Sequence, residues 1–362
     1  MANMAKFYKL RVADVRKETA DCVSIAFEIP NDIKHDYHYI QGQYLTLKLN
    51  VNGEDVRRSY SICSSPAEDE PLRIAVKKVF KGKGSSFIND NLKAGDFLEV
   101  MTPMGNFHSP MQASHKKNYV LLAGGSGITP MLSIIKTVLK QEPQSKLVLL
   151  YGNLDEEATI FKSEIDRLAR ENQERFTVSY VFQTPREACD ELNKGLMTVD
   201  KIQALLKKDL PAGDNEFFIC GPTVMMDNAM NALINAGIEK SRIHIEYFST
   251  PVEEKDIDAL NSADKLSYVR SQVKVICDGD ETTFTLEPNH NVLEAALAAN
   301  IDAPYACRGG SCCTCRALLV EGKVEMAVNF ALLESEVEEG YILTCQSHAL
   351  TPTLVVDYDK GR

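Results

Sequence analysis

Nine residues near the C-terminus hold four of the chain's ten cysteines, and they constrain the fold around them more than any other stretch. The loop reads Cys-Arg-Gly-Gly-Ser-Cys-Cys-Thr-Cys over residues 307–315, and a further cysteine follows at Cys345. Four residues separate Cys307 from Cys312, two separate Cys312 from Cys315, and 29 separate Cys315 from Cys345. This C-x4-C-x2-C…C spacing is that of plant-type [2Fe–2S] ligation. It predicts three thiolates on one tight loop and a distant fourth that closes the site.

Two other interpretations of these cysteines are a structural zinc site and a disulfide framework. Zinc sites usually pair two short C-x2-C hooks, whereas this chain has one such hook and a lone partner. Cys313 lies outside the ligand spacing, and we interpret it as a bystander. The other cysteines are scattered through a long chain, which suits reduced thiols in the cytoplasm better than a secreted scaffold; they are Cys22, Cys63, Cys189, Cys220 and Cys277.

The composition is that of an ordinary globular protein, with 44% hydrophobic and 25% charged residues in a chain of 362, long enough for two or three domains. The N-terminus has no apolar run behind its positive charge, and no stretch approaches the roughly 20 apolar residues of a membrane span. We therefore expect a cytoplasmic protein with no membrane partner.

The net charge of −11 is unevenly distributed. Residues 269–362 carry 7 Lys and Arg against 14 Asp and Glu, a net charge of −7. Nucleic acid is an unlikely partner, because phosphate binding requires a basic face. The acidity at the cysteine-rich end could steer a basic docking surface towards it, or it could serve only solubility.

The first hundred residues have the pattern of an antiparallel β-barrel. Short segments alternate apolar and polar residues with a period of two, and turn residues separate them; they are 7–15, 22–28, 44–51, 56–63, 72–79 and 97–101. Asn52-Gly53 is a hairpin turn signal between two of them. Arg58 and Tyr60 share one face of a strand, where a guanidinium can grip a phosphate and a ring can pack on a flat ligand.

A glycine-rich stretch follows the predicted strand over 72–79. Residues 82–86, Gly-Lys-Gly-Ser-Ser, precede a short helix expected at 87–92, so backbone N–H groups and hydroxyls could meet a pyrophosphate there. Residues 103–107 are expected to close the barrel.

From residue 118 the pattern changes to alternating strands and helices, which predicts a parallel sheet covered on both faces. The expected strands are 119–123, 147–151, 176–182, 217–220 and 243–247, and the expected helices are 131–140, 158–170, 199–206 and 224–236. Gly124-Gly125-Ser126-Gly127 forms a turn before the first helix, with Thr129 as the expected N-cap. Such a turn brings bare backbone to a pyrophosphate at the helix N-terminus, although it is not the G-x-G-x-x-G fingerprint.

Two strands of this sheet end in suggestive residues, Cys220-Gly221-Pro222 and Glu246-Tyr247-Phe248. Ligands of such sheets bind at the carboxyl ends of strands. The plainer explanations are a small buried residue for Cys220 and a solvated strand end for Glu246.

These motifs together resemble the ferredoxin–NADP reductase superfamily. The residues that carry the resemblance are Arg58-x-Tyr60-Ser61, Gly82-x-Gly84-Ser85, Gly124-Gly125-x-Gly127-Ile128-x-Pro130, Cys220-Gly221-Pro222 and Glu246-x-Phe248. With the C-terminal [2Fe–2S] domain, the whole chain is similar to the reductase component of bacterial multicomponent oxygenases. Within that group it most resembles the reductase subunits of phenylacetyl-CoA epoxidases.

The resemblance implies a role for each matching residue. Arg58 would contact the flavin phosphate, Tyr60 would stack on the isoalloxazine, and Ser61 would lie near its N5. Gly82, Gly84 and Ser85 would hold the FAD pyrophosphate. Ser61, Cys220 and Glu246 would form the catalytic site for hydride transfer. The remaining cofactor-binding residues, for the nicotinamide nucleotide, would be Gly124, Gly125, Gly127, Thr129, Gly221, Pro222 and Phe248.

The sequence departs from the family pattern after residue 153. Where many relatives have Tyr-Gly-Asn-Arg, this chain has Tyr-Gly-Asn-Leu, with Leu154 followed by Asp155, Glu156 and Glu157. This removes a candidate cation for a 2′-phosphate and adds acids, so the donor is left as NADPH or NADH.

The predicted fold is multidomain. A flavin-binding antiparallel β-barrel occupies 1–112, a doubly wound α/β nucleotide domain 113–249, a charged linker 250–267, and an α+β β-grasp ferredoxin domain 268–362. In the last domain we expect a hairpin around Asp278-Gly279 and a helix over 292–300. The linker could let this domain swing between the flavin and a partner.

The leading functional hypothesis is an enzyme that passes electrons from NAD(P)H through FAD and a [2Fe–2S] cluster to a di-iron oxygenase acting on phenylacetyl-CoA. One alternative keeps the chemistry and changes the client to a ring-hydroxylating, steroid or alkane oxygenase. Another is a non-enzymatic electron-relay module whose first two domains bind neither flavin nor nucleotide. The chain itself has no di-iron Glu-x-x-His set in a helical bundle.

Overall fold

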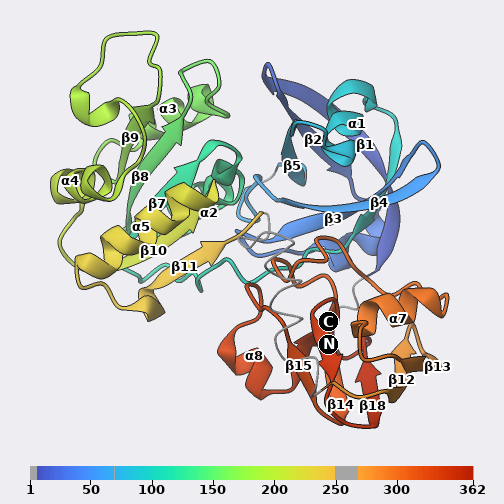
Figure 1. The fold of residues 1–362 in the computed structure, drawn as a ribbon. Coiled ribbons are helices and arrows are strands. Elements are labelled where there is room, and N and C mark those ends of the chain that lie inside the picture. Colours follow the sequence, from blue (N-terminus) through green and yellow to red (C-terminus); the bar gives the residue numbers. More distant parts are fainter. Residues whose placement is uncertain (1–5, 69, 249–267, 362) are drawn as a thin grey trace.

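The computed structural model describes residues 6–68, 70–248 and 268–361, which form three domains in chain order (Figure 1). The flavin-type barrel, the α/β domain and the cysteine-rich domain meet around a common centre, with the third domain packed against the end of the barrel. The predicted linker, 250–267, lies outside the described residues. The domain limits of 112, 249 and 268 therefore stay a prediction.

The barrel is a six-stranded antiparallel sheet in the order β4-β3-β6-β1-β2-β5. Its strands are β1 (Phe7–Thr19), β2 (Cys22–Glu28), β3 (Tyr44–Val51), β4 (Glu54–Ser61), β5 (Arg73–Lys77) and β6 (Phe97–Met101). A bridge between Ile62 and Ile74 joins the two edges and closes the curled sheet. Asn52 and Gly53 both have positive φ between β3 and β4, so the predicted hairpin turn is confirmed.

The glycine-rich stretch after β5 enters its helix earlier than the sequence predicts. Helix α1 runs over Lys83–Asn91, with Gly82 as its N-cap, so the expected start at residue 87 is wrong. Gly84 and Ser85 therefore lie in the first helical turn, where backbone N–H groups have no partners within the helix.

The second domain is a five-stranded parallel sheet in the order β11-β10-β7-β8-β9, which confirms the doubly wound prediction. Its strands are β7 (Lys117–Gly124), β8 (Lys146–Asn153), β9 (Phe176–Phe182), β10 (Asp214–Cys220) and β11 (Ile243–Glu246). Four helices cover it: α2 (Ile128–Gln141), α3 (Lys162–Glu171), α4 (Val199–Asp209) and α5 (Thr223–Asn235). The strand order reverses between β7 and β10, so a crevice for ligands is expected at their carboxyl ends.

Two helix starts in this domain differ from the sequence prediction. A 3₁₀ turn over Gly125–Gly127 runs directly into α2, which makes Gly127 the N-cap; the prediction of Thr129 as N-cap is wrong. The Thr129 hydroxyl instead donates to the Ser126 carbonyl at 3.1 Å. Helix α3 begins at Lys162 rather than 158, because Phe161 has a left-handed backbone with φ of 60°.

The third domain packs helix α7 (Val292–Ala298) on a five-stranded mixed sheet in the order β13-β12-β18-β14-β16, as a β-grasp fold requires. These strands are β12 (Ser271–Cys277), β13 (Asp280–Leu286), β14 (Arg316–Glu321), β16 (Tyr341–Leu343) and β18 (Thr353–Asp357). Strands β15 (Val324–Met326) and β17 (Ser347–Ala349) form a small second sheet, and the short helix α8 covers Glu334–Glu338. Asp278 and Gly279 have positive φ, so the predicted hairpin is confirmed.

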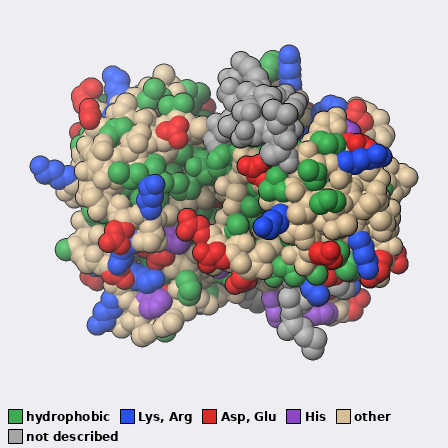
Figure 2. Space-filling model, turned by 60° about the horizontal axis from the view of Figure 1, so that its bottom comes forward, with side chains coloured by type: hydrophobic (Ala, Val, Ile, Leu, Met, Phe, Trp, Pro, Cys, Tyr) green, Lys and Arg blue, Asp and Glu red, His purple; other side chains and the backbone are tan. Residues whose placement is uncertain are grey.

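The hydrophobic cores of the domains are continuous across their contacts. Tyr44, Met101 and Met104 of the barrel pack into the core of the third domain, and Phe107 packs into that of the second. None of the helices in the described ranges is long and apolar enough to cross a bilayer. On the face shown in Figure 2, acidic and basic side chains are interspersed.

Candidate functional site

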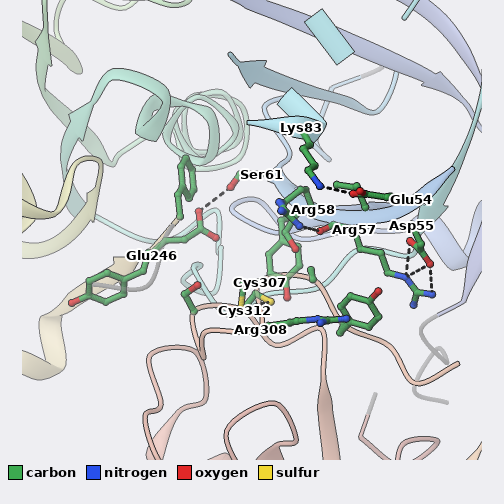
Figure 3. Close-up of a pocket in the computed structure, with 18 residues that line it drawn as sticks. Glu54, Asp55, Arg57, Arg58, Ser61, Lys83, Glu246, Cys307, Arg308 and Cys312 are labelled. Carbon is green, nitrogen blue, oxygen red and sulfur yellow. Dashed lines mark hydrogen bonds and ion pairs between the residues drawn. The ribbon is translucent and has the colours of Figure 1, made fainter. Parts of the chain in front are cut away.

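A cavity of about 640 Å³ lies where the barrel, the end of β11 and the cysteine loop meet (Figure 3). Its wall includes Arg58 and Ser61 from β4, Glu246 from β11, and Cys307 and Cys312 from the cysteine loop. The volume is in the range of cofactor sites. Residues that the sequence assigns to flavin, hydride transfer and cluster therefore share one cavity.

Ser61 and Glu246 are joined across two domains. The Ser61 Oγ donates to Glu246 Oε2 at 2.9 Å, and Figure 3 shows the two side chains pointing towards each other. Burial raises the pKa of Glu246 to about 8, and the hydrogen bond from Ser61 partly opposes this rise. At neutral pH the carboxyl is therefore mostly protonated. Glu246 is partly exposed towards the cavity and is hydrogen-bonded to Ser61, so it is not a freely solvated strand end.

Arg58, Tyr60 and Gly84 converge beside the cavity. A Cβ on Gly84 would lie 3.4 Å from Arg58 Cγ and 3.5 Å from the Tyr60 hydroxyl oxygen, so a side chain there would fill the groove between them. Arg58 Nη1 donates to the Arg57 carbonyl at 2.7 Å, which leaves other guanidinium donors for a phosphate. The groove between Arg58, Tyr60 and Gly84 lies at the N-terminus of α1, and this combination fits a flavin phosphate.

Two of the predicted flavin residues play less direct parts. The Ser85 hydroxyl accepts from the Val79 amide at 3.1 Å and donates to the Gly82 carbonyl at 3.3 Å, so it fixes the loop. Tyr60 is half-buried against the barrel core, beside the residues that line the cavity. Phe248, by contrast, is 45% exposed and lines the cavity directly.

A second cavity of about 320 Å³ lies at the switch point of the parallel sheet. Gly124, Gly125 and Pro222 line it, as the sequence predicts for a nucleotide site. Asn153 lines it too, and its Nδ2 is buried with no hydrogen-bond partner among the described residues. An unpaired buried donor is costly unless a ligand satisfies it, so this crevice fits a polar nucleotide.

The remaining predicted nucleotide residues pack the two turns together. A Cβ on Gly127 would lie 2.1 Å from the Cys220 carbonyl oxygen, and one on Gly221 would lie 2.9 Å from the Gly124 amide nitrogen. Only glycine permits this approach. The Cys220 thiol is fully buried and burial raises its pKa, so the side chain belongs to the core beneath the site. Cys220 lines neither of the two cavities.

The cysteine loop places its predicted ligands in pairs. Cys307 Sγ and Cys312 Sγ are 3.2 Å apart, and the Cys315 thiol interacts with that of Cys345. The Gly309 amide points at Cys307 Sγ at 3.4 Å, as a loop that stabilises thiolate charge should. No three His, Cys, Asp or Glu side chains of the described residues converge on one ion-sized point. Two pairs of thiols suit a two-iron cluster better than a single zinc ion.

Sequence reasoning missed several residues at these sites. Lys77 of β5 lines the second cavity, which we call the nucleotide cavity, from the barrel side. Tyr44 of β3 lines the first cavity, which we call the flavin cavity, beside the cysteine loop. Both stand in ordinary alternating strands and carry no local motif. Only the packing of one domain on another brings them to the sites.

Comparison with known proteins agrees with this arrangement of sites. Three family models match in order: an oxidoreductase FAD-binding domain over residues 9–109, an oxidoreductase NAD-binding domain over 121–231, and a 2Fe-2S iron-sulfur cluster binding domain over 275–350. One of the subunits of 1,2-phenylacetyl-CoA epoxidase from Escherichia coli K12 is 37% identical, with 99% of each chain covered. The chain belongs to the reductase components of bacterial multicomponent oxygenases.

Other relatives of the reductase also match over nearly their whole length. The ferredoxin reductase component of 3-ketosteroid-9-alpha-monooxygenase from Rhodococcus rhodochrous is 35% identical, with 96% of each chain covered. The solved structure of phthalate dioxygenase reductase is 26% identical, covers 97% of this chain and 98% of its own, and superposes with a TM-score of 0.58.

Family membership identifies the reductase as an oxidoreductase that uses FAD, a nicotinamide nucleotide and a [2Fe–2S] cluster to supply electrons to an oxygenase. The electron-relay alternative, in which the first two domains bind neither flavin nor nucleotide, does not fit this family.

Proposed function

We propose that this reductase supplies electrons from NADH or NADPH to a di-iron oxygenase that acts on phenylacetyl-CoA, as part of phenylacetate degradation. The proposal of the client follows the E. coli relative, whose similarity extends over 99% of both chains. We keep the cytoplasm as the proposed compartment, because none of the ten cysteines is in a disulfide, which suits a reducing environment.

The observation that carries the electron route is the shared cavity. Ser61, Glu246, Cys307 and Cys312 all line it. When bound, FAD would accept a hydride from the nicotinamide and the cluster would accept its electrons singly. A flavin in this cavity would therefore lie beside both the hydride-transfer residues and the cluster ligands.

The chain's own residues would bind and orient these groups. Arg58 and the N-terminus of α1 would hold the flavin phosphates, and Ser61 would offer a hydroxyl to the flavin ring. The Gly124-Gly125 turn would receive the phosphates of the nucleotide. Cys307, Cys312, Cys315 and Cys345 would hold the two irons.

An absorbance spectrum of the anaerobically purified protein tests the cofactors first. We expect flavin bands overlaid on iron–sulfur absorbance, bleached by NADH or NADPH, and separate additions show which nucleotide is preferred. A spectrum with a cluster and no flavin would contradict the proposed electron route.

The client is tested by reconstitution. The reductase, a phenylacetyl-CoA epoxidase oxygenase component, phenylacetyl-CoA, O2 and the preferred nucleotide should together give the epoxide. A steroid oxygenase is the second candidate, because a steroid monooxygenase reductase is 35% identical. Hydroxylation of a 3-ketosteroid with that oxygenase, and no epoxide with the first, would replace the proposed client.

A further inference from the structure

The cysteine loop is held against the barrel by a defined docking patch. We define this patch as Tyr44, Thr46 and Arg57 on strands β3 and β4, with Asp302, Tyr305, Cys313 and Thr314 facing them. The Cys313 amide donates to the Tyr44 hydroxyl at 2.9 Å, and the Thr46 and Thr314 hydroxyls are 3.1 Å apart. All four of these residues are buried. The loop therefore meets the barrel through specific polar contacts in a region closed to water.

Arg57 makes the charged contact of the docking patch. Its side chain is only 3% exposed, and its Nη2 pairs with Asp302 Oδ1 of the third domain at 2.5 Å. Lys48 adds a second cation 3.6 Å from the same carboxylate. Burial alone would raise the pKa of Asp302, but the hydrogen bond from Arg57 and the positive charges lower it below its usual value. Asp302 is therefore charged when it meets Arg57.

Arg57 also connects to the cluster ligands through an aromatic ring. Its guanidinium carbon lies 4.5 Å from the centre of the Tyr305 ring, and that of Arg308 lies 4.3 Å from the same ring. Arg308 directly follows the predicted ligand Cys307. Cation–π contacts at buried sites are stronger than exposed ones, because water does not compete. The stack ties the barrel to the start of the cysteine loop.

A buried guanidinium must keep a counter-charge, and Arg57 has one inside its own domain. Its Nη2 lies 2.9 Å from Asp55 Oδ2, two residues away on β4. If the third domain moved away, Arg57 would remain paired with Asp55 and would gain water. The contact with Asp302 can thus form and break without leaving an unpaired buried charge.

We propose that Arg57 is a positioning residue for internal electron transfer: with Asp302 and Tyr305 it holds the cysteine loop beside the flavin cavity. The inference rests on the proposed function, because it concerns the step between flavin and cluster. Electron tunnelling falls steeply with distance, so a loop held less firmly against the barrel passes electrons less often.

The first test removes the charge of Asp302, which is 66% exposed and can change without disturbing a core. Asp302→Asn is compared with Asp302→Glu, which keeps the charge, and with Glu281→Gln as a matched control. Glu281 pairs with Lys274 within the third domain, away from the docking patch. In stopped-flow mixing with the preferred nucleotide, the flavin bleaches first and the cluster signal follows.

We expect Asp302→Asn to leave flavin bleaching unchanged and to slow the cluster signal about tenfold, equivalent to about 1.4 kcal/mol of lost docking free energy. Asp302→Glu should restore most of the rate, and Glu281→Gln should match the original protein. Arg57→Gln should slow the cluster signal similarly, and the double variant should be no slower than the slower single variant, because both changes remove one contact.

A second readout does not depend on turnover. In hydrogen–deuterium exchange on the holoprotein, Asp302→Asn should speed exchange in peptides covering 311–315, where the Cys313 amide is bonded to Tyr44, and not in those covering β12 and β13. An unchanged cluster signal and unchanged exchange would overturn the role of Arg57. A wild-type protein whose cluster is never reduced after its flavin would instead overturn the proposed function.

Discussion

Ser61 and Glu246 are 185 residues apart in the sequence and share one hydrogen bond at the flavin cavity. We expect Ser61→Ala to slow flavin reduction about a hundredfold, which is typical of losing one hydrogen-bond donor at a reacting centre. The change also leaves the Glu246 carboxyl without its partner. Stopped-flow bleaching of the flavin measures this rate directly.

The control for this change is Ser179→Ala, which also removes one hydroxyl, here bonded to Asp209; neither residue lines either cavity. It should bleach at the original rate. If Ser61→Ala bleached as fast as this control, Ser61 would have no part in hydride transfer.

We expect Glu246 to make the rate of flavin reduction depend on pH. Its pKa of about 8 lies above the ordinary value of 4.5, so the carboxyl is neutral at pH 7 and becomes charged as pH rises through about 8. A carboxylate would repel the electron density that the flavin gains, so flavin reduction should slow in that range. Glu246→Gln should be flat across it. A profile that Glu246→Gln does not change would assign the pH dependence to another group.

The raised pKa of Glu246 also predicts how the free energy of unfolding changes with pH. Between pH 4.5 and about 8 the folded protein holds the proton of Glu246 and the unfolded chain does not. The contribution of this group to the free energy of unfolding therefore falls as pH rises through that window. Glu246→Gln should remove that part of the pH dependence in denaturant titrations.

At the level of elements, the fold agrees with the sequence wherever one strand or turn carries its own signal. The sequence predicts strands over 22–28, 44–51, 97–101 and 176–182, and the structure has strands over the same residues. The hairpin at Asn52-Gly53 needs only local backbone preferences. Ends of helices are predicted less well, because the cap at Gly127 depends on a 3₁₀ turn that packs against the Cys220 carbonyl from another strand.

The features of the candidate site also separate into those with a local sequence signal and those without one. The cysteine spacing and the glycine turns are local, so the sequence predicts them. Other features depend on contacts between domains. They are the Ser61–Glu246 hydrogen bond, the Arg57–Asp302 ion pair, and the position of Lys77 at the nucleotide cavity. No sequence pattern records how the domains pack, so these contacts emerge only in the structure.

We expect the end of β8 to influence whether NADPH or NADH is preferred. Leu154 is 53% exposed and lines the nucleotide cavity, while the adjacent Asp155 is tied to Arg186 at 2.9 Å. Leu154→Arg would add a free cation for a 2′-phosphate. The ratio of kcat/KM for NADPH to that for NADH should rise about tenfold, or about 1.4 kcal/mol, close to the lower end for a hydrogen bond to a charged group.

Leu154→Gln is the matched control for this prediction, because it is polar and of similar size but uncharged. It should change the ratio much less. Equal changes in the two variants would show that side-chain shape, and not charge, sets the preference at this position.

Over the whole molecule, negative charge is concentrated in the third domain, from which we expect electrons to leave. Residues 269–362 carry a net charge of −7, and Glu334, Glu338 and Glu339 on and beside α8 are exposed. Such a field attracts basic partners and raises their association rate, and salt weakens it. Reduction of a basic acceptor protein such as cytochrome c should therefore slow about tenfold between about 0.01 and 0.3 M salt.

Replacing those three glutamates with glutamine should reduce this salt dependence and slow the reaction at low salt. The control replaces three exposed glutamates of the second domain, Glu171, Glu174 and Glu187, so that the net charge changes equally. If the acidic residues steer partners to the third domain, only the variant that replaces Glu334, Glu338 and Glu339 should change the rate and its salt dependence. Equal effects of the two triple variants on the rate would mean that the net charge of the whole protein, and not its position, attracts the acceptor. If neither variant changed the rate, solubility would remain as the role of the acidic residues.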